Sequence, residues 1–567
     1  MNGYKIILKN DNYKFQVVFG GRLFSSDIGF TDDGTAYKRF WNKYGRPPAQ
    51  IYQQYIIDRR DLLVPQNIRE VKGSFFTPKI WADKSKEYLA SVFGADWQDE
   101  YYVWDCAAGT GNLLAGLSNE YNVWASDVEQ GNVETMQSLI DIDENLNLLS
   151  GHVFQFDFLN DSFDKLPEEL KKIIDDPEKR KKLIVYINPP YAEAANNKKI
   201  QGKNGKKSVE KTLVGEKYEN RLSHAKKELF AQFLMRIYLE IPDCKIAEFS
   251  TLKALQAPRF STFRSVFLAR LENCFIVPAD TFENVKGQFP IGFKIWDTTI
   301  KEIFIKTSVD VFDKNGNSIG QRNYYSYDGG VKFINDWAQA FRKPFDVKYS
   351  IATLIGIAND FQQQNLTFFD RPYKKVIASN HNFQVTKDNL IESAIYYTVR
   401  HAIPADWLND RDQFLYPNDN YKSDIEFQND CLMNILFNNN IQSKDGINHW
   451  IPFTEKEVGA REKFESNFMS DFLKGRTLSA EATAVLNAGK ELWKYYHATI
   501  KNNKTVSVNA SYYDIREYFQ GRKENGTMNT KSTDETYNDL IKILREALKV
   551  LAKKIEPAVY KYGFLRE

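Results

Sequence analysis

Between residues 101 and 305 the chain alternates short β-rich runs with helical patterns. The β-rich runs are Tyr101–Asp105, Asn122–Asp127, His152–Asp157, Leu183–Asn188, Lys245–Ser250 and Cys274–Pro278. The helical patterns between them are Asn112–Leu117, Val133–Ile140 and Lys226–Leu239. Strands separated by helices predict βαβ units, and hence an α/β fold with a doubly wound, mostly parallel sheet. No helix separates Cys274–Pro278 from Pro290–Asp297, so we expect these two runs to form an antiparallel hairpin at one edge of the sheet.

The alternation stops near residue 310, and the remaining residues mix aromatic, Asn-rich and Lys-rich stretches. Near its end the chain has an amphipathic helical pattern. Its apolar stripe contains Leu540, Ile543, Leu544, Ala547, Leu548 and Leu551. We therefore expect an N-terminal extension over residues 1–70, a doubly wound domain over 71–310, and a separate α+β domain over 311–567.

Composition excludes several classes of protein. With 567 residues, 43% hydrophobic and 26% charged, the chain has the make-up of a globular protein of two or more domains. No apolar run is long enough to span a bilayer, and the first residues lack a signal-peptide core, so we expect a soluble protein without a membrane partner. The four scattered cysteines predict neither a metal site nor a disulfide framework, which fits a reducing, cytoplasmic compartment. The formal net charge of +2 does not by itself indicate a nucleic-acid partner.

A glycine turn follows the first of these strands, in the segment Val103–Leu114. Gly109 and Gly111 allow the backbone to bend sharply and a ligand to lie against it. The carboxylate of Asp105, at the strand tip, is placed to pair with a ligand ammonium group. A dinucleotide site would have the third glycine of a G-x-G-x-x-G turn, which is absent here. An ordinary strand-to-helix turn is the alternative interpretation.

Two further acids follow the next strands. Asp127, with Glu129 after it, has the position of an acid that accepts the ribose hydroxyls of a nucleoside, although a solvated loop residue is the alternative. Asp157 is placed to accept a hydrogen bond from an adenine amino group, and Phe158 to stack on that ring.

The most specific pattern is Asn188-Pro-Pro-Tyr191, at the end of the fourth strand. Two prolines make a rigid turn that presents acceptors, namely the Asn188 side-chain oxygen and the Pro189 carbonyl. An exocyclic amine that donates to both would direct its lone pair at an electrophilic methyl group. Tyr191 supplies a flat face for a base. The alternative is a purely structural Pro-Pro turn.

These motifs resemble the S-adenosylmethionine-dependent amino-methyltransferases that modify DNA, over residues 73–300. The family has a glycine-rich cofactor motif, like Asp105–Leu114, and an (Asn/Asp/Ser)-Pro-Pro-(Tyr/Phe) catalytic motif, like Asn188–Tyr191. Its N-terminal cofactor motif is similar to Gly73–Pro78. The order of the motifs resembles the gamma arrangement, which implies a seven-stranded Rossmann-like sheet and a C-terminal target-recognition domain.

The resemblance implies roles for particular residues. The cofactor contacts would be Phe76, Thr77, Asp105, Ala107, Gly109, Gly111, Asp127, Asp157 and Phe158. The catalytic turn would be Asn188, Pro189, Pro190 and Tyr191. An aromatic residue after the sixth strand would stack on the flipped base. Phe282 and Phe289 both qualify, and we favour Phe282 because it follows the strand directly, with a core role as the alternative for each.

A lysine-rich stretch over residues 196–227 leaves directly from the catalytic turn. Its position and charge predict a loop that contacts the phosphate backbone of DNA, whereas a solvated loop is the alternative. The lysines to which we assign DNA contacts are Lys198, Lys199, Lys203, Lys206 and Lys207.

Taken together, the resemblance implies a monomeric, site-specific DNA methyltransferase that acts on adenine N6 of a flipped-out base in duplex DNA. It would be an orphan or the partner of a cognate restriction endonuclease. Family members that act on cytosine N4 tend to carry Ser at the first catalytic position, where this chain has Asn188. Methylation of RNA or of a release-factor glutamine would use the same kind of turn, and a DNA-binding protein with an inactive site would also carry these motifs. Cytosine C5 chemistry is excluded because the chain has no Pro-Cys dipeptide, and a Walker A loop and a nuclease motif are also absent.

Overall fold

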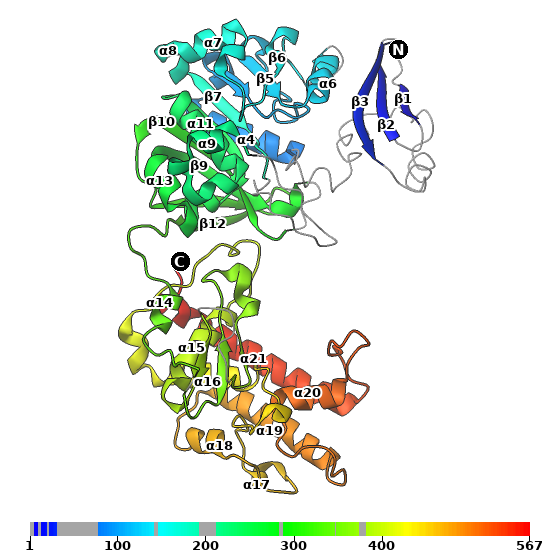
Figure 1. The fold of residues 1–567 in the computed structure, drawn as a ribbon, viewed down its shortest axis with the longest axis vertical. Helices are drawn as coiled ribbons and strands as arrows, with labels where there is room; N and C mark the ends of the chain where they lie inside the picture. Colours follow the sequence, from blue (N-terminus) through cyan, green and yellow to red (C-terminus); the bar gives the residue numbers. More distant parts are fainter. Residues whose placement is uncertain are drawn as a thin grey trace. The chain divides into compact units, whose positions relative to one another are not determined.

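The computed structural model describes residues 77–140, 146–191, 211–282, 287–345, 347–373 and 381–567, and the backbone of three strands nearer the N-terminus. These strands, β1 (Lys5–Lys9), β2 (Tyr13–Phe19) and β3 (Arg22–Phe30), form an antiparallel sheet. The chain divides into two compact units, Met1–Asp328 and Gly329–Glu567 (Figure 1). Residue 310, where the sequence analysis placed a boundary, lies inside a strand of the first unit.

The first unit is built on a sheet with the order β12-β11-β9-β10-β8-β7-β4-β5-β6. Its parallel part consists of β4 (Tyr102–Asp105), β5 (Val123–Asp127), β6 (Val153–Gln155), β7 (Leu183–Ile187) and β8 (Lys245–Thr251). Every residue of β7 is buried, as expected for a central parallel strand with both faces covered. The predicted α/β fold with a large, mostly parallel sheet is therefore confirmed.

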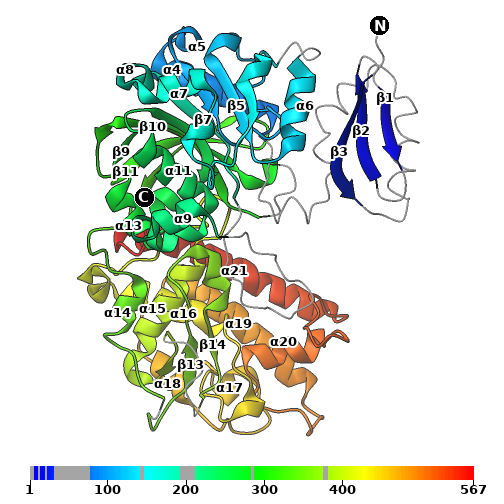
Figure 2. The same cartoon turned by 45° about the horizontal axis from the view of Figure 1, so that its top comes forward.

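Helices cover both faces of this sheet (Figures 1 and 2). Helices α4 (Lys79–Phe93) and α6 (Gln130–Ile140) bury apolar side chains in one core with Val103 of β4. The next residue, Trp104, points to the opposite face and packs edge-on against Phe158, with ring centroids 5.6 Å apart. The alternation of the two side chains along β4 is the reason that the sheet needs a helical layer on each side.

The far edge of the sheet differs from the prediction. Strands β9 (Ala269–Pro278) and β10 (Pro290–Lys301) do pair in an antiparallel way, but they do not close the edge. Strand β11 (Lys306–Phe312) pairs in parallel with β9, and β12 (Ser318–Tyr325) pairs with β11, which gives nine strands where seven were expected. The two added strands satisfy backbone groups that β9 would otherwise expose at an edge.

The helix that was expected over 112–117 is also absent. Residues in this segment form successive turns, because Gly109, Gly111 and Gly116 all have positive φ values, of 55°, 87° and 82°. Left-handed residues so close together interrupt the i to i−4 hydrogen bonds that a helix needs.

The second unit is mainly helical, with a small antiparallel sheet. The sheet has the order β14-β13-β15. Its strands are β13 (Ala352–Ile355), β14 (Phe368–Asp370) and β15 (Phe383–Val385). The helices are α14 (Ile334–Ala338), α15 (Leu390–His401), α16 (Ile425–Leu436), α17 (Glu455–Val458), α18 (Phe468–Leu473), α19 (Ala480–Thr499), α20 (Tyr512–Gln520) and α21 (Glu535–Lys561). Helices α19 and α21 pack along each other, and α16 contacts both.

The amphipathic helix expected near the end of the chain is α21. Leu544, Leu548 and Leu551 are buried, as predicted, but Ile543 is 58% exposed and Ile541 takes its place in the core. A step of 100° per residue places 541, 544 and 548 on one stripe and turns 543 away from it. Within the described part of the chain, none of the helices is both long and apolar enough to cross a membrane.

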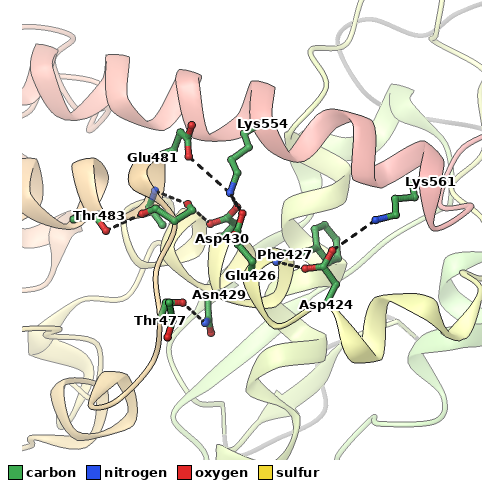
Figure 3. Close-up of polar contacts among 12 residues, drawn as sticks. Asp424, Glu426, Phe427, Asn429, Asp430, Thr477, Glu481, Thr483, Lys554 and Lys561 are labelled. Atoms are coloured by element: carbon green, nitrogen blue, oxygen red, sulfur yellow. Dashed lines mark hydrogen bonds and ion pairs between the residues drawn. The ribbon is translucent and has the colours of Figure 1, made fainter.

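A cluster of charges joins three of these helices (Figure 3). Lys554 of α21 lies 2.6 Å from both Glu426 and Asp430 of α16, and 3.8 Å from Glu481 in the first turn of α19. The other oxygen of Asp430 accepts a hydrogen bond from Ser479, the residue that caps α19, at 2.6 Å. Burial raises the pKa of Asp430, and the lysine opposes this effect. The ammonium group of Lys554 therefore neutralises a carboxylate that is enclosed between the helices.

Candidate active site

The residues singled out in the sequence meet at one edge of the large sheet. Asp105 and Asp127 are the last residues of β4 and β5, Asn188 directly follows β7, and Asp157 follows β6 by two residues. These four strands are neighbours in the order β7-β4-β5-β6 and run parallel. The carboxyl edge of such a sheet is where doubly wound proteins bind their ligands.

The glycine turn is tight and positions its carboxylate in the interior. Asp105 is 1% exposed, and its Oδ1 accepts a hydrogen bond from the backbone N–H of Ala107 at 3.0 Å. A Cβ atom on Gly111 would lie 3.1 Å from the side chain of Leu146 and would be attached to a left-handed backbone. Glycine is therefore required at this position by both space and conformation.

Asp127 stabilises this turn through hydrogen bonds. Its Oδ2 accepts from the backbone N–H of Gly109 at 2.9 Å. Its Oδ1 accepts from the backbone N–H of Glu129 and from the side chain of Asn132, both at 2.9 Å. Asp127 thus ties the end of β5 to the glycine turn, a structural role that the sequence did not indicate. A carboxylate oxygen has two acceptor positions, so one position on Oδ2 stays available for a further donor.

Burial sets the electrostatics of this edge. Burial raises the pKa of Asp105 to about 8, and the nearby charge of Asp127 adds to the effect. Burial also raises the pKa of Asp127, against which its three hydrogen-bond donors act. A buried carboxyl group with a raised pKa ionises more readily when a cation binds beside it.

The segment after β6 is arranged differently from the prediction. Asp157 accepts from the backbone N–H groups of Leu159 and Asn160 and from the Asn160 side chain, so it closes a local turn. Phe158 is 2% exposed and stacks on Phe233 with ring centroids 4.9 Å apart. In this structure Phe158 is therefore a core residue and presents no face to a ligand, because its ring is already covered by other aromatic rings.

The turn Asn188–Tyr191 is held by hydrogen bonds at both ends of the Asn188 side chain. Its Nδ2 donates to the hydroxyl of Thr77 at 2.9 Å, and its Oδ1 accepts from the hydroxyl of Tyr191 at 2.5 Å. Pro189 is buried, whereas Pro190 and Tyr191 are partly exposed. Burial, followed by the negative charge of a nearby glutamate, raises the pKa of the Tyr191 hydroxyl well above its usual value, so this group stays a hydrogen-bond donor.

The two phenylalanines proposed for base stacking differ in exposure. Phe282 is completely buried, edge-on to Tyr191 and to Phe249, with centroid distances of 6.5 and 5.8 Å. Phe289 is only partly buried. A ring must expose a face to stack on a base, so Phe289 is the better candidate, and the preference for Phe282 is reversed by its burial.

Two contacts on the other side of the site were not predicted. Trp81 of α4 donates its indole N–H to the hydroxyl of Thr281 at 2.8 Å, and Thr281 donates to the carbonyl of Pro278 at 2.6 Å. Trp81 and Thr281 are 200 residues apart in the sequence, so no local signal predicts the hydrogen bond between them.

Some predicted residues lie outside the described residues. They are Phe76 and the lysines Lys198, Lys199, Lys203, Lys206 and Lys207. In the described remainder of the lysine-rich stretch, Lys211 forms an ion pair with Glu216 at 3.7 Å, and Lys226 pairs with Glu219.

No family model matches this chain, and no curated protein matches it. Among solved structures, the chain is similar to a nuclease-deletion mutant of the type ISP restriction-modification enzyme LlaGI in complex with a DNA substrate mimic, with 13% identity over 59% of this chain and a TM-score of 0.35. It is also similar to the M protein of the type I restriction enzyme EcoKI, with 14% identity over 50% of this chain and a TM-score of 0.28. A third similar structure is a putative class I S-adenosylmethionine-dependent methyltransferase from Listeria monocytogenes, with 13% identity over 42% of this chain and a TM-score of 0.26.

The matched regions span 39, 55 and 65% of those three chains, which is less than two thirds of each. Similarities with TM-scores this low do not establish a shared function.

Proposed function

We propose that this protein is an S-adenosylmethionine-dependent DNA methyltransferase that acts on adenine N6 of a flipped-out base. The observation that carries the proposal is the juxtaposition of the Asn188–Tyr191 turn and the Asp105–Gly111 turn at adjacent strand ends of one sheet edge. One turn offers acceptors for an exocyclic amine. The other offers a buried carboxylate and a close backbone approach for a ligand.

The residues at the glycine turn fit the proposed cofactor. The buried Asp105 would meet the ammonium group of the methionyl part, which compensates the unfavourable burial of the carboxylate. The remaining acceptor position on Asp127 Oδ2 suits a ribose hydroxyl, and the positive φ values of Gly109 and Gly111 give the tight turn against which the ligand would lie. When bound, S-adenosylmethionine supplies the methyl group.

The catalytic turn would act on the target amine through its acceptors. Asn188 Oδ1 and the Pro189 carbonyl accept the two amine hydrogens and so keep the nitrogen lone pair directed at the methyl group. Because an amide oxygen has two acceptor positions, Tyr191 and the target amine can share Oδ1. After the methyl group has been attached, the nitrogen would release its extra proton to water, so no general base is needed.

The remaining parts of the proposal concern the partners. The second unit would read the target sequence in duplex DNA, and the protein would act as a monomer, either beside a cognate restriction endonuclease or as an orphan. The test is sequencing-based detection of modified bases in DNA from cells that express the protein, beside cells that express Asn188→Ala. N6-methyladenine within one short motif, absent with the variant, supports the proposal. N4-methylcytosine would change the base assignment, and unmodified DNA in both cultures would contradict DNA methylation.

The affinity for S-adenosylmethionine is expected to depend on pH through Asp105. Its pKa is raised to about 8, and the cofactor ammonium pairs only with the ionised carboxylate, so a proton must leave before binding. Affinity should therefore rise about tenfold per pH unit below that pKa, and it should fall again at higher pH, where the cofactor's amino group, with a pKa of about 8, loses its proton. Calorimetry in two buffers of different ionisation enthalpy measures both the affinity and the released proton. Asp105→Asn should bind more weakly and without this pH dependence, and an affinity of the wild type that does not change with pH would place the ammonium elsewhere.

Neutralising Lys203, Lys206 and Lys207 by substitution with Gln is expected to weaken DNA binding equally for all sequences. Each phosphate contact that is lost should reduce the slope of log affinity against log salt by about 0.9. The matched control replaces Lys172, Lys179 and Lys181 with Gln. Lys179 and Lys181 lie in α8 (Pro177–Lys181), which ends just before β7 begins, and Lys172 lies in the preceding helix α7 (Glu168–Asp175). Equal effects of the two triple variants would contradict a specific role for the loop.

A further inference from the structure

The residues Thr77–Trp81 connect the two sides of the proposed active site. Thr77 is buried, and its hydroxyl accepts from the side-chain amide of Asn188, 111 residues away. Four residues later, the buried indole of Trp81 donates to Thr281, next to Phe282. The Pro78 carbonyl between them accepts from the backbone N–H groups of Trp81 and Ala82 at 2.9 and 3.0 Å, and so starts α4. A single rigid segment therefore has one hydrogen bond to each side.

The hydrogen bond to Thr77 has two consequences for the Asn188 amide. It fixes the amide plane at the nitrogen end, while Tyr191 fixes the oxygen end. It also polarises the amide, because an N–H group that donates makes the carbonyl oxygen of the same amide a stronger acceptor. Thr77 therefore holds the nitrogen end of the amide in place while Tyr191 and the target amine share Oδ1.

We propose that Thr77 is a positioning residue of the catalytic turn, whose hydroxyl holds the Asn188 amide in the orientation in which its oxygen receives the target amine. Trp81 extends the same support to the segment that carries Phe282. The proposal rests on the proposed methyl transfer. It differs from the role that the resemblance assigned to this segment, which was contact with the methionyl part of the cofactor.

The two roles predict different kinetics. Thr77→Val keeps the shape of the side chain and removes the hydroxyl, whereas Thr77→Ser keeps the hydroxyl. If Thr77 positions Asn188, the single-turnover rate of methyl transfer at saturating cofactor should fall about tenfold in Thr77→Val, the effect of losing one hydrogen bond in the transition state. The cofactor dissociation constant should stay within a few-fold, and Thr77→Ser should restore most of the rate. If Thr77→Val does not fold, Thr77→Ala replaces it in the comparison with Thr77→Ser.

The matched control is Thr298→Val. Thr298 is a buried threonine of β10 whose hydroxyl donates to the carbonyl of Cys244 at 2.7 Å, at the opposite end of β8 from the catalytic turn. This variant loses a comparable hydrogen bond in the same sheet and should keep the wild-type rate. A weaker cofactor affinity with an unchanged saturated rate in Thr77→Val would overturn the proposal in favour of a cofactor contact.

A second measurement does not require activity. Thr77→Val and Asn188→Ala break the same hydrogen bond, so the fall in Tm of the double variant should be smaller than the sum of the two single falls. Additive falls would overturn the contact and with it the proposal. Non-additive falls in a protein that binds the cofactor but methylates no DNA would instead contradict the proposed function and leave the positioning role standing.

Discussion

Asn188→Ala is expected to reduce methyl transfer by at least about 10²-fold while it changes cofactor affinity by no more than a few-fold. The magnitude follows from other enzymes in which one preorganised hydrogen-bonding group at the reacting atoms has been removed. The side chain of Asn188 would contact the target amine and not the cofactor. Truncation also removes the hydrogen bonds that join Asn188 to the hydroxyls of Thr77 and Tyr191.

Single-turnover methylation of DNA measures the rate of methyl transfer, and calorimetry with S-adenosylmethionine measures the cofactor affinity. Asn188→Asp keeps an acceptor oxygen and should retain more activity than Asn188→Ala. The control is Asn119→Ala, which removes a hydrogen bond to Asp99 in the same unit, at 2.9 Å, and should leave the rate unchanged. An Asn188→Ala protein with the wild-type rate would remove the turn from the mechanism. Equal losses in both alanine variants would show that the effect is one of stability.

The position of the site at the carboxyl edge could be predicted because local patterns are enough to locate it. Strands β4 and β5 end at an aspartate and β7 is followed directly by Asn188, and parallel strands bring such ends together. The glycines could be interpreted because the turn after β4 requires positive φ values, which other residues adopt only with strain.

Features that depend on partners distant in the sequence could not be predicted. Asp127 has the pattern of a ligand-binding acid, yet its Oδ2 accepts from the backbone N–H of Gly109, a donor that arrives only when the glycine turn folds against β5. Phe158 follows an acid at a strand end, as a stacking residue would. Whether its ring meets a ligand or Phe233 depends on how α11 (Leu229–Glu240) packs, which a local pattern does not encode. The hydrogen bond between Thr77 and Asn188 also joins residues that are distant in the sequence, so a local pattern does not predict it.

The added strands at the far edge show a different limitation. In β11, Thr307, Val309 and Val311 are more buried than Lys306, Ser308 and Asp310, respectively, and Gly316, with a φ of 83°, forms the turn that leads to β12. This is a hairpin signal of the ordinary kind. It was missed because the helix–strand alternation ends before it, and a boundary was drawn where the alternation stopped. A change of pattern marks the end of the βαβ units and not the end of the sheet.

The largest effect on stability is expected for Lys554→Ala in the second unit. The side chain of Asp430 is 4% exposed and lies 2.6 Å from the Lys554 ammonium (Figure 3). Removing the lysine leaves a buried carboxylate with Ser479 as its remaining hydrogen-bond donor, and losing one partner of such a pair costs about 3–5 kcal/mol. Because Lys554 itself is 28% exposed, water will reach the site and lower the free-energy cost of the unpaired carboxylate. We therefore expect the lower end of the range.

Hydrogen exchange measured on peptides of α16, α19 and α21 tests this expectation, since local opening of the three helices can be followed without assuming two-state unfolding of a two-unit chain. Lys549→Ala is the matched control. It lies on the same helix, is 72% exposed, and pairs with Glu546 at 2.8 Å, so its loss should cost less than about 0.5 kcal/mol. Loss of protection in Lys554→Ala no greater than in this control would show that the cluster does not stabilise the helices.

The pH dependence of the stability loss in Lys554→Ala tests whether the unpaired charge of Asp430 causes that loss. Burial raises the pKa of Asp430, and removing Lys554 raises it further, because the opposing positive charge is gone. A carboxyl group whose pKa is higher in the folded than in the unfolded protein destabilises the fold as pH rises through that range, and the effect disappears when the group is protonated in both states. The difference between Lys554→Ala and wild type should therefore shrink as pH falls. A difference that stays constant with pH would assign the loss to packing of the lysine stem and not to the unpaired charge.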